Sequence, residues 1–202
     1  MEEDPEDALT WKMLGITRIK QGKHAGAEEA LKQAVKLDDK NVDYWKGLGI
    51  TRGLQGNHAG AEEALKQAVN LDGKDADSWK GLGMTRGLQG NHAGAEEALK
   101  QAVKLDDKDA DSWKWLGVAR RLQKNHAGAE EALKQAVNLD GKDADSWKGL
   151  GMARWLQGNH AGAEKALKQA VNLDPTNPGS LDALGIVSYT NCFDSRRQLR
   201  SS

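Results

Sequence analysis

The feature that most constrains the fold is a repeat with a period of 34 residues. The stretch from residue 76 to residue 109, ADSWKGLGMTRGLQGNHAGAEEALKQAVKLDDKD, meets near-copies of itself when the sequence is shifted by that period. Its tryptophan recurs in register as Trp11, Trp45, Trp79, Trp113 and Trp147. A fixed period of this length indicates an array of stacked units, because each unit buries its apolar face only against a neighbour.

The sequence of each unit predicts two helices joined by a short turn. In the third unit the first helix follows Asp75, a good N-cap, and ends near Leu88. Gly90 is suited to end that helix, and Asn91 is suited to cap the next one, which runs to about Leu105. Glutamate and lysine four residues apart recur in the second helices and predict ion pairs on their outer face, at Glu28–Lys32, Glu62–Lys66, Glu96–Lys100, Glu130–Lys134 and Glu164–Lys168.

The spacing of tryptophan, leucine, glycine and alanine resembles the tetratricopeptide repeat (TPR). In the third unit the matching residues are Trp79, Leu82, Gly83, Ala95, Leu99, Ala102, Leu105 and Asp106. The resemblance implies an all-α fold, a right-handed α-solenoid of stacked helix–turn–helix repeats in a TPR-like superhelix. Two rows depart from the family pattern. Arginine replaces an aromatic residue at Arg18, Arg52, Arg86, Arg120 and Arg154, and histidine replaces a tyrosine at His24, His58, His92, His126 and His160.

The register divides the chain into three parts. Residues 1–7 form an acidic N-terminal leftover or cap, and five repeats follow at residues 8–41, 42–75, 76–109, 110–143 and 144–177. Residues 178–202 form a partial sixth repeat, expected to be a capping helix followed by a tail. Because the Ala-rich pattern is missing there, we expect the last dozen residues to be frayed or irregular.

Composition excludes several classes of function. With 29 basic and 30 acidic side chains the net charge is −1, whereas nucleic-acid and anionic-membrane surfaces need a basic excess. Cys192 is the only cysteine, so neither an intrachain disulfide nor a cysteine-based zinc site is expected. No apolar run predicts a secretory signal or a membrane span, so a cytoplasmic protein is expected. No catalytic motif and no cofactor site is recognised, and one histidine per repeat does not converge on a metal ion. We therefore expect a protein that is not an enzyme.

By the resemblance, the first helix of each repeat lines a concave groove. A lysine row lies at Lys46, Lys80, Lys114 and Lys148, and an apolar row lies one turn further at Ile50, Met84, Val118 and Met152. Nearby glycines, at positions 47, 81 and 149 together with positions 53 and 87, are expected to leave room for a ligand's side chains. Three residues break the copying at Trp115, Arg121 and Trp155, and tryptophan and arginine are enriched in interaction hot spots. Drift, or packing of these tryptophans inside an altered interface, is the competing interpretation.

These residues predict a scaffold that binds a protein, either as a peptide or as a partner helix, with hydrophobic and acidic side chains. Self-association is an alternative, end to end or as a dimer through the C-terminal half-repeat, because near-identical units make the two ends compatible. A designed or recently duplicated array without an evolved ligand is a third interpretation, favoured by the near-identity of the units.

Overall fold

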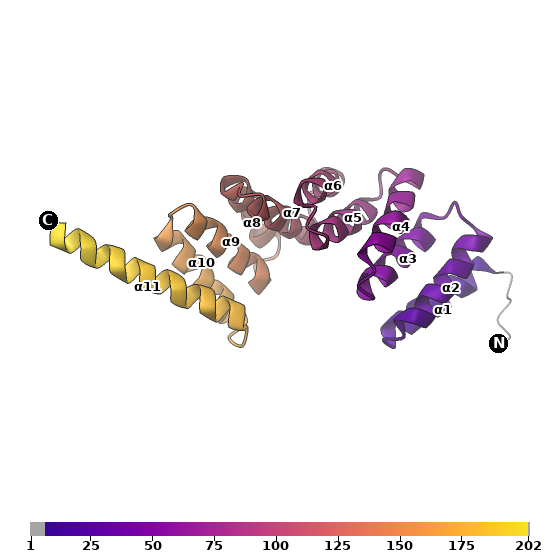
Figure 1. Cartoon of the computed structure of the whole chain (residues 1–202), viewed down its shortest axis with the longest axis horizontal. Helices are drawn as coiled ribbons and strands as arrows, with labels where there is room; N and C mark the ends of the chain where they lie inside the picture. Colours follow the sequence, from indigo (N-terminus) through magenta and orange to yellow (C-terminus); the bar gives the residue numbers. More distant parts are fainter. Residues whose placement is uncertain (1–6, 202) are drawn as a thin grey trace. The chain divides into compact units, whose positions relative to one another are not determined.

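A computed structural model describes the backbone of residues 7–201 and the side chains of residues 7–190. Within that range the chain is entirely helical, with eleven helices and no strand (Figure 1). Five helix pairs follow one another: α1 (Ala8–Lys20) and α2 (His24–Leu37), α3 (Val42–Leu54) and α4 (His58–Leu71), α5 (Ala76–Leu88) and α6 (His92–Leu105), α7 (Ala110–Leu122) and α8 (His126–Leu139), α9 (Ala144–Leu156) and α10 (His160–Leu173). A single helix, α11 (Pro178–Ser201), ends the described chain. The all-α fold of stacked helix pairs is confirmed.

The chain divides into two compact units. The N-terminal unit, Met1–Asp106, contains α1 to α6, and the C-terminal unit, Asp107–Ser202, contains α7 to α11. Within each unit the second helix of one repeat packs against the first helix of the next, as α4 does against α5 and α8 does against α9. None of the helices in the described range has the length and the hydropathy needed to cross a bilayer.

The helices begin and end at the predicted signals. The Asp75 carboxylate accepts a hydrogen bond from the Ser78 backbone N–H at 3.0 Å and so caps α5. Gly90 adopts a φ of 81° after that helix, which glycine reaches without strain, and the Asn91 side chain then caps α6. The same turn carries glycine in three other repeats, whereas the fourth repeat places Lys124 there with a φ of 64°.

The core is built from a leucine of each second helix that fits against glycines of the first helices. A Cβ atom on Gly83 would lie 2.5 Å from Cγ of Leu99 in the same repeat. Leu65 lies against two such positions, because a Cβ on Gly49 or on Gly81 of the next repeat would approach it to 2.6 or 3.0 Å. The helices therefore approach more closely than a larger residue would allow.

This packing corrects one expectation about the groove. The glycines at positions 47, 81 and 149 were expected to leave room for a ligand. Instead, the space that their missing side chains would take is occupied by a leucine of the preceding repeat, at Leu31, Leu65 and Leu133 respectively. These glycines therefore serve the packing between repeats, and Gly81 and Gly149 also line the two grooves described below.

In the second to fifth repeats the tryptophan is hydrogen-bonded to the loop before its helix. The Trp79 indole N–H donates to the backbone carbonyl of Gly73 at 2.9 Å, and the ring packs on the core formed by Leu65, Val69, Leu82 and Ala98. The same bond joins Trp45 to Asp39, Trp113 to Asp107 and Trp147 to Gly141. Buried indoles usually have such a partner, and here it fixes the connection between two repeats.

The arginine row makes hydrogen bonds at the position where the family usually has an aromatic residue. Arg86 donates through Nη1 to the carbonyl of Gly94 in its own repeat and through Nε to Glu62 of the preceding repeat, at 3.2 and 3.0 Å. Glu62 also accepts from Lys66 at 2.9 Å, and equivalent Glu–Lys pairs occur in all five second helices, as predicted. A polar link thus replaces aromatic packing at this position.

The two ends of the chain differ from expectation in one respect. The Asp7 side chain caps α1, while residues 1–6 of the expected acidic leftover lie outside the described residues. The expectation of a frayed or irregular C-terminus is wrong, because α11 is one helix of 24 residues (Figure 1). The Asn177 side chain caps its first turn, and no proline or glycine follows Gly185 to end the helix.

Candidate functional site

A groove of about 560 Å³ runs along the first helices of the N-terminal unit. We call it the N-terminal groove. It brings together four residues predicted from the sequence, Lys46 and Ile50 of α3 with Lys80 and Met84 of α5. Leucines at the ends of the same helices also line it, and they were not predicted: Leu54 and Leu88.

A second groove, of about 650 Å³, lies in the C-terminal unit and is formed by α7, α9 and α11. We call it the C-terminal groove. It brings together six predicted residues: Lys114, Trp115, Val118, Arg121, Lys148 and Met152. The third wall comes from α11, with Gly179, Asp182, Ala183 and Ile186. Sequence reasoning missed this wall, although extending the repeat register places Asp182 in the lysine row and Ile186 in the apolar row.

The groove lysines are held by aspartates of the repeats themselves. Lys114 Nζ lies 2.7 Å from Asp111 and 3.2 Å from Asp143, which is the N-cap of α9. Burial would lower the pKa of Lys114, but its hydrogen bonds and charge interactions with these two aspartates outweigh burial and raise it. Lys46 is held in the same way by Asp43 and Asp75. Lys46 and Lys114 therefore join neighbouring first helices, and the paired lysines of the row offer little unneutralised charge.

Arg121 is different from the lysines around it. Its Nε atom is buried without a hydrogen-bond partner, and no carboxylate of the described residues lies in ion-pair contact with its guanidinium. Lys148, the other cation of the C-terminal groove beside Lys114, is paired with Asp145 at 2.5 Å. The equivalent positions in the N-terminal groove are Gly53 and Gly87, so that groove has no such cation.

Comparison with protein families identifies the chain. The tetratricopeptide repeat model matches residues 12–78, 81–143 and 127–178. The chain belongs to the tetratricopeptide repeat family. TPR proteins generally act as scaffolds for interactions between proteins, which agrees with the class of function predicted from the sequence.

Solved TPR structures resemble the chain over most of its length. A crystal structure of MamA protein has 26% sequence identity and a TM-score of 0.74, and the match covers 83% of this chain and 92% of MamA. PilF of Pseudomonas aeruginosa has 17% identity and a TM-score of 0.81, with coverage of 96% and 87%. YrrB, described as a TPR protein with an unusual peptide-binding site, has 19% identity and a TM-score of 0.74, with coverage of 90% and 94%. No curated protein matches the sequence.

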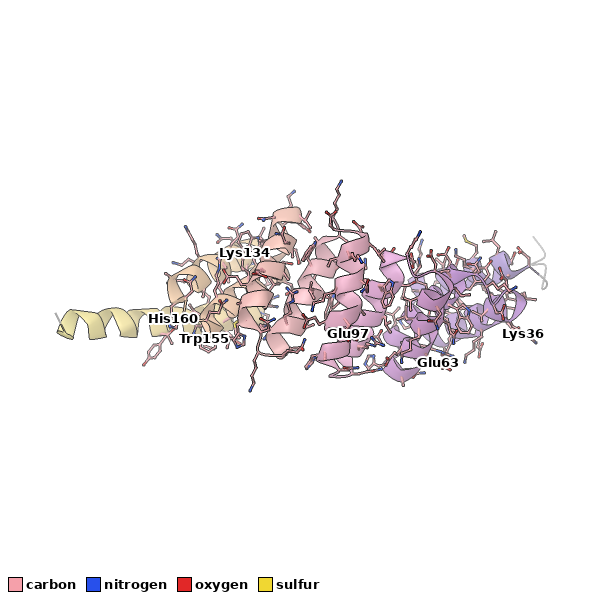
Figure 2. All side chains as sticks on the ribbon, turned by 90° about the horizontal axis from the view of Figure 1, so that it is seen from above. Lys36, Glu63, Glu97, Lys134, Trp155 and His160 are labelled. Atoms are coloured by element: carbon pink, nitrogen blue, oxygen red, sulfur yellow. The ribbon has the colours of Figure 1, made fainter. Side chains whose placement is uncertain are left out.

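Trp155 is the one predicted groove residue of this TPR chain that lines neither groove. Its side chain, labelled in Figure 2, packs on a cluster formed by Ala163, Leu167, Ala183 and Val187, which joins α10 to α11. The packing interpretation therefore holds for Trp155, whereas Trp115 lines the C-terminal groove. The two tryptophans that break the repeat pattern thus lie in different surroundings.

The TPR histidines are turn-proximal residues at the start of each second helix. Their Nδ1 atoms are buried without a hydrogen-bond partner in His24, His58 and His126. Among the side chains that the structure describes, no group of three His, Cys, Asp or Glu residues is placed to hold a metal ion. The position that usually carries tyrosine in this family is therefore filled here by a partly buried imidazole.

Proposed function

We propose that the C-terminal groove binds a peptide or partner helix that places a carboxylate on Arg121 and an apolar side chain against Trp115 and Met152. The observation that carries the proposal is the isolated guanidinium of Arg121, which lines an otherwise largely apolar groove. Support at the level of the family comes from the general role of TPR proteins as interaction scaffolds.

The guanidinium of Arg121 contains a buried donor, Nε, without a hydrogen-bond partner. A buried N–H without a partner costs about 1–3 kcal/mol, and a hydrogen bond to a charged group contributes about 1.5–3 kcal/mol. A planar guanidinium binds a carboxylate with two parallel hydrogen bonds, so a ligand carboxylate would bind Arg121 with a defined geometry. Lys114 contributes less, because Asp111 and Asp143 already neutralise it.

Apolar contacts supply the remaining affinity. Trp115 and Met152 are half-buried, and Ile186 on α11 is 55% exposed, so each retains surface that a ligand can cover. Burial of this surface stabilises a complex by about 25 cal/mol per Å². An aromatic ring and an arginine beside one another match the composition of interaction hot spots.

The test is a selection of peptides from a random display library on the immobilised full chain. We expect the selected peptides to carry Asp or Glu close to apolar residues. Replacement Arg121→Ala or Trp115→Ala should weaken a selected peptide by at least about tenfold. The matched variants Met84→Ala and Ile50→Ala in the N-terminal groove should leave its Kd unchanged. Failure to select any peptide, or equal binding by Arg121→Ala, would overturn the proposal.

A further inference from the structure

One side of α11 has a helix face that the described residues of its unit leave partly uncovered, with Leu184 packed at the edge of the cluster between α10 and α11. We call this surface the open face of α11 and define it by Leu181, Leu184, Gly185 and Ser188. Leu181 is 45% exposed, and a Cβ atom on Gly185 would meet no atom within 4 Å. The opposite sides of the helix are occupied, since Ala183 and Val187 pack on α10 and Ile186 lines the C-terminal groove.

The complete repeats show what covers the same face when it is occupied. The glycine that corresponds to Gly185 is Gly15, Gly49, Gly83, Gly117 or Gly151. In every one of these repeats a Cβ on that glycine would lie 2.5–2.7 Å from Cγ of a leucine of the second helix. The neighbouring leucine is 1% exposed in α5, α7 and α9, whereas its counterpart Leu184 is only partly buried. The open face thus keeps the surface of an interface that is formed five times elsewhere.

We propose that the open face of α11 binds a helix of a partner protein that has the chemistry of the chain's own second helices. Such a helix has a leucine that fits against Gly185, with alanines one residue before and three residues after it. In the repeats these alanines, for example Ala98 and Ala102, are fully buried and allow the two backbones to approach closely. This site is separate from the C-terminal groove and goes beyond the proposed function.

A second copy of the chain is the less suitable occupant. The leucines of the second helices are all already buried, with an exposed fraction of at most 2%: Leu31, Leu65, Leu99, Leu133 and Leu167. A second copy would have to unfold one of its repeats before a second helix could expose its leucine for binding. End-to-end continuation is also disfavoured at α1, because Met13 stands where Gly47 and Gly81 accept the leucine of a preceding repeat.

The test is an amide NMR titration of the isotope-labelled full chain with a synthetic peptide that has the sequence of residues 159–174, the capped second helix of the last complete repeat. We expect saturable shifts confined to residues 181–188. Gly185→Leu places a side chain in the open face and should lower the affinity for the peptide by at least about tenfold. Leu181→Asp is a second variant with the same expected loss, in case the first disturbs the fold. A control peptide in which the residue equivalent to Leu167 is glutamine should bind at least about tenfold more weakly.

The outcomes separate this inference from the proposed function. Arg121→Ala removes the groove cation and should leave binding of the helix peptide unchanged, while Gly185→Leu should leave binding of a groove peptide unchanged. Absence of shifts in residues 181–188, or equal binding by the glutamine peptide, would overturn the inference. A molar mass that doubles without peptide, together with shifts in residues 181–188 on dilution, would assign the face to a second copy and overturn it as well.

Discussion

Nε of Arg154 lies 3.0 Å from a carboxylate oxygen of Glu130, and the two residues belong to neighbouring repeats. The amide of Gln157 donates to the other carboxylate oxygen at 2.8 Å, and Lys134 approaches the first at 2.9 Å. The same link joins Arg52 to Glu28 and Arg86 to Glu62. A charged hydrogen-bond network therefore connects the second helix of one repeat to the first helix of the next.

Stability should decline in acid through this network. Burial would raise the pKa of Glu130, but hydrogen bonds from Lys134, Arg154 and Gln157 outweigh it and lower the pKa to about 2, below the ordinary 4.5. The stabilisation is therefore complete above about pH 4.5 and is lost as the pH falls toward 2. Urea unfolding measures the free energy of unfolding of the wild type and of Glu130→Gln at pH 7 and pH 3. At pH 7 we expect this free energy to be about 1 kcal/mol lower for the variant than for the wild type. Between pH 7 and pH 3 we expect it to fall less for the variant than for the wild type.

Glu131→Gln is the matched control for that experiment. Glu131 is exposed and takes part in none of the ion pairs of the described residues, so its replacement should leave both unfolding curves unchanged. Equal effects of the two substitutions would show that the link between repeats contributes nothing specific.

Alanine should have opposite effects at two equivalent glycines. A Cβ on Gly151 would lie 2.6 Å from Cγ of Leu167, so Gly151→Ala should destabilise the C-terminal unit by about 1–3 kcal/mol. At Gly185 there is no atom within 4 Å, and alanine favours a helix over glycine by about 1 kcal/mol, so Gly185→Ala should stabilise α11. Thermal unfolding followed by circular dichroism distinguishes the two. A destabilising Gly185→Ala would show that the open face is closed in solution.

The turn between α7 and α8 offers a stabilising substitution. Lys124 adopts a φ of 64°, a conformation that costs a non-glycine residue about 1–2 kcal/mol. Lys124→Gly should therefore raise the midpoint of thermal unfolding, and the reverse change Gly158→Lys, at an equivalent turn with a φ of 79°, should lower it. If Lys124→Gly lowers the midpoint instead, the left-handed turn is not a source of strain in this repeat.

Trp155 and Trp115 should respond differently to replacement by alanine. Trp155→Ala removes a ring from the cluster that holds α11 on α10, so it should cost about 2 kcal/mol and speed hydrogen exchange in α11. For Trp115→Ala the measurement is binding of a groove peptide. This variant should lose affinity for the peptide, and its loss of stability should be smaller than that of Trp155→Ala. Unchanged exchange in α11 of Trp155→Ala would contradict the packing assignment.

Most of the fold can be predicted from the repeat period in the sequence. Caps such as Asp75 and Asn91 and the glycine at position 90 are local signals, so the helix ends in each repeat could be read from neighbouring residues. The end of α11 could not, because the absence of an Ala-rich pattern indicates only that no second helix follows. Nothing in residues 190–201 stops a helix, and the backbone continues to Ser201.

The candidate site was predictable in part. The register brought the lysine and apolar rows to one side of the first helices, and ten of the eleven predicted residues line the two grooves. Three facts depend on three-dimensional packing and could not be predicted. Asp143 binds Lys114 from the next repeat, which neutralises a groove lysine, and Trp155 turns toward the core while Arg121 keeps an unpartnered Nε.

The proposed function requires that the guanidinium of Arg121 recognises a ligand carboxylate in the C-terminal groove. A charge-reversal cycle tests it most directly, with Arg121→Glu in the protein and an acidic residue replaced by lysine in a peptide selected on the wild type. We predict that each change alone weakens binding by at least about tenfold and that the two together restore most of the affinity. Additive losses in the doubly changed complex, or no loss from Arg121→Glu, would contradict the account.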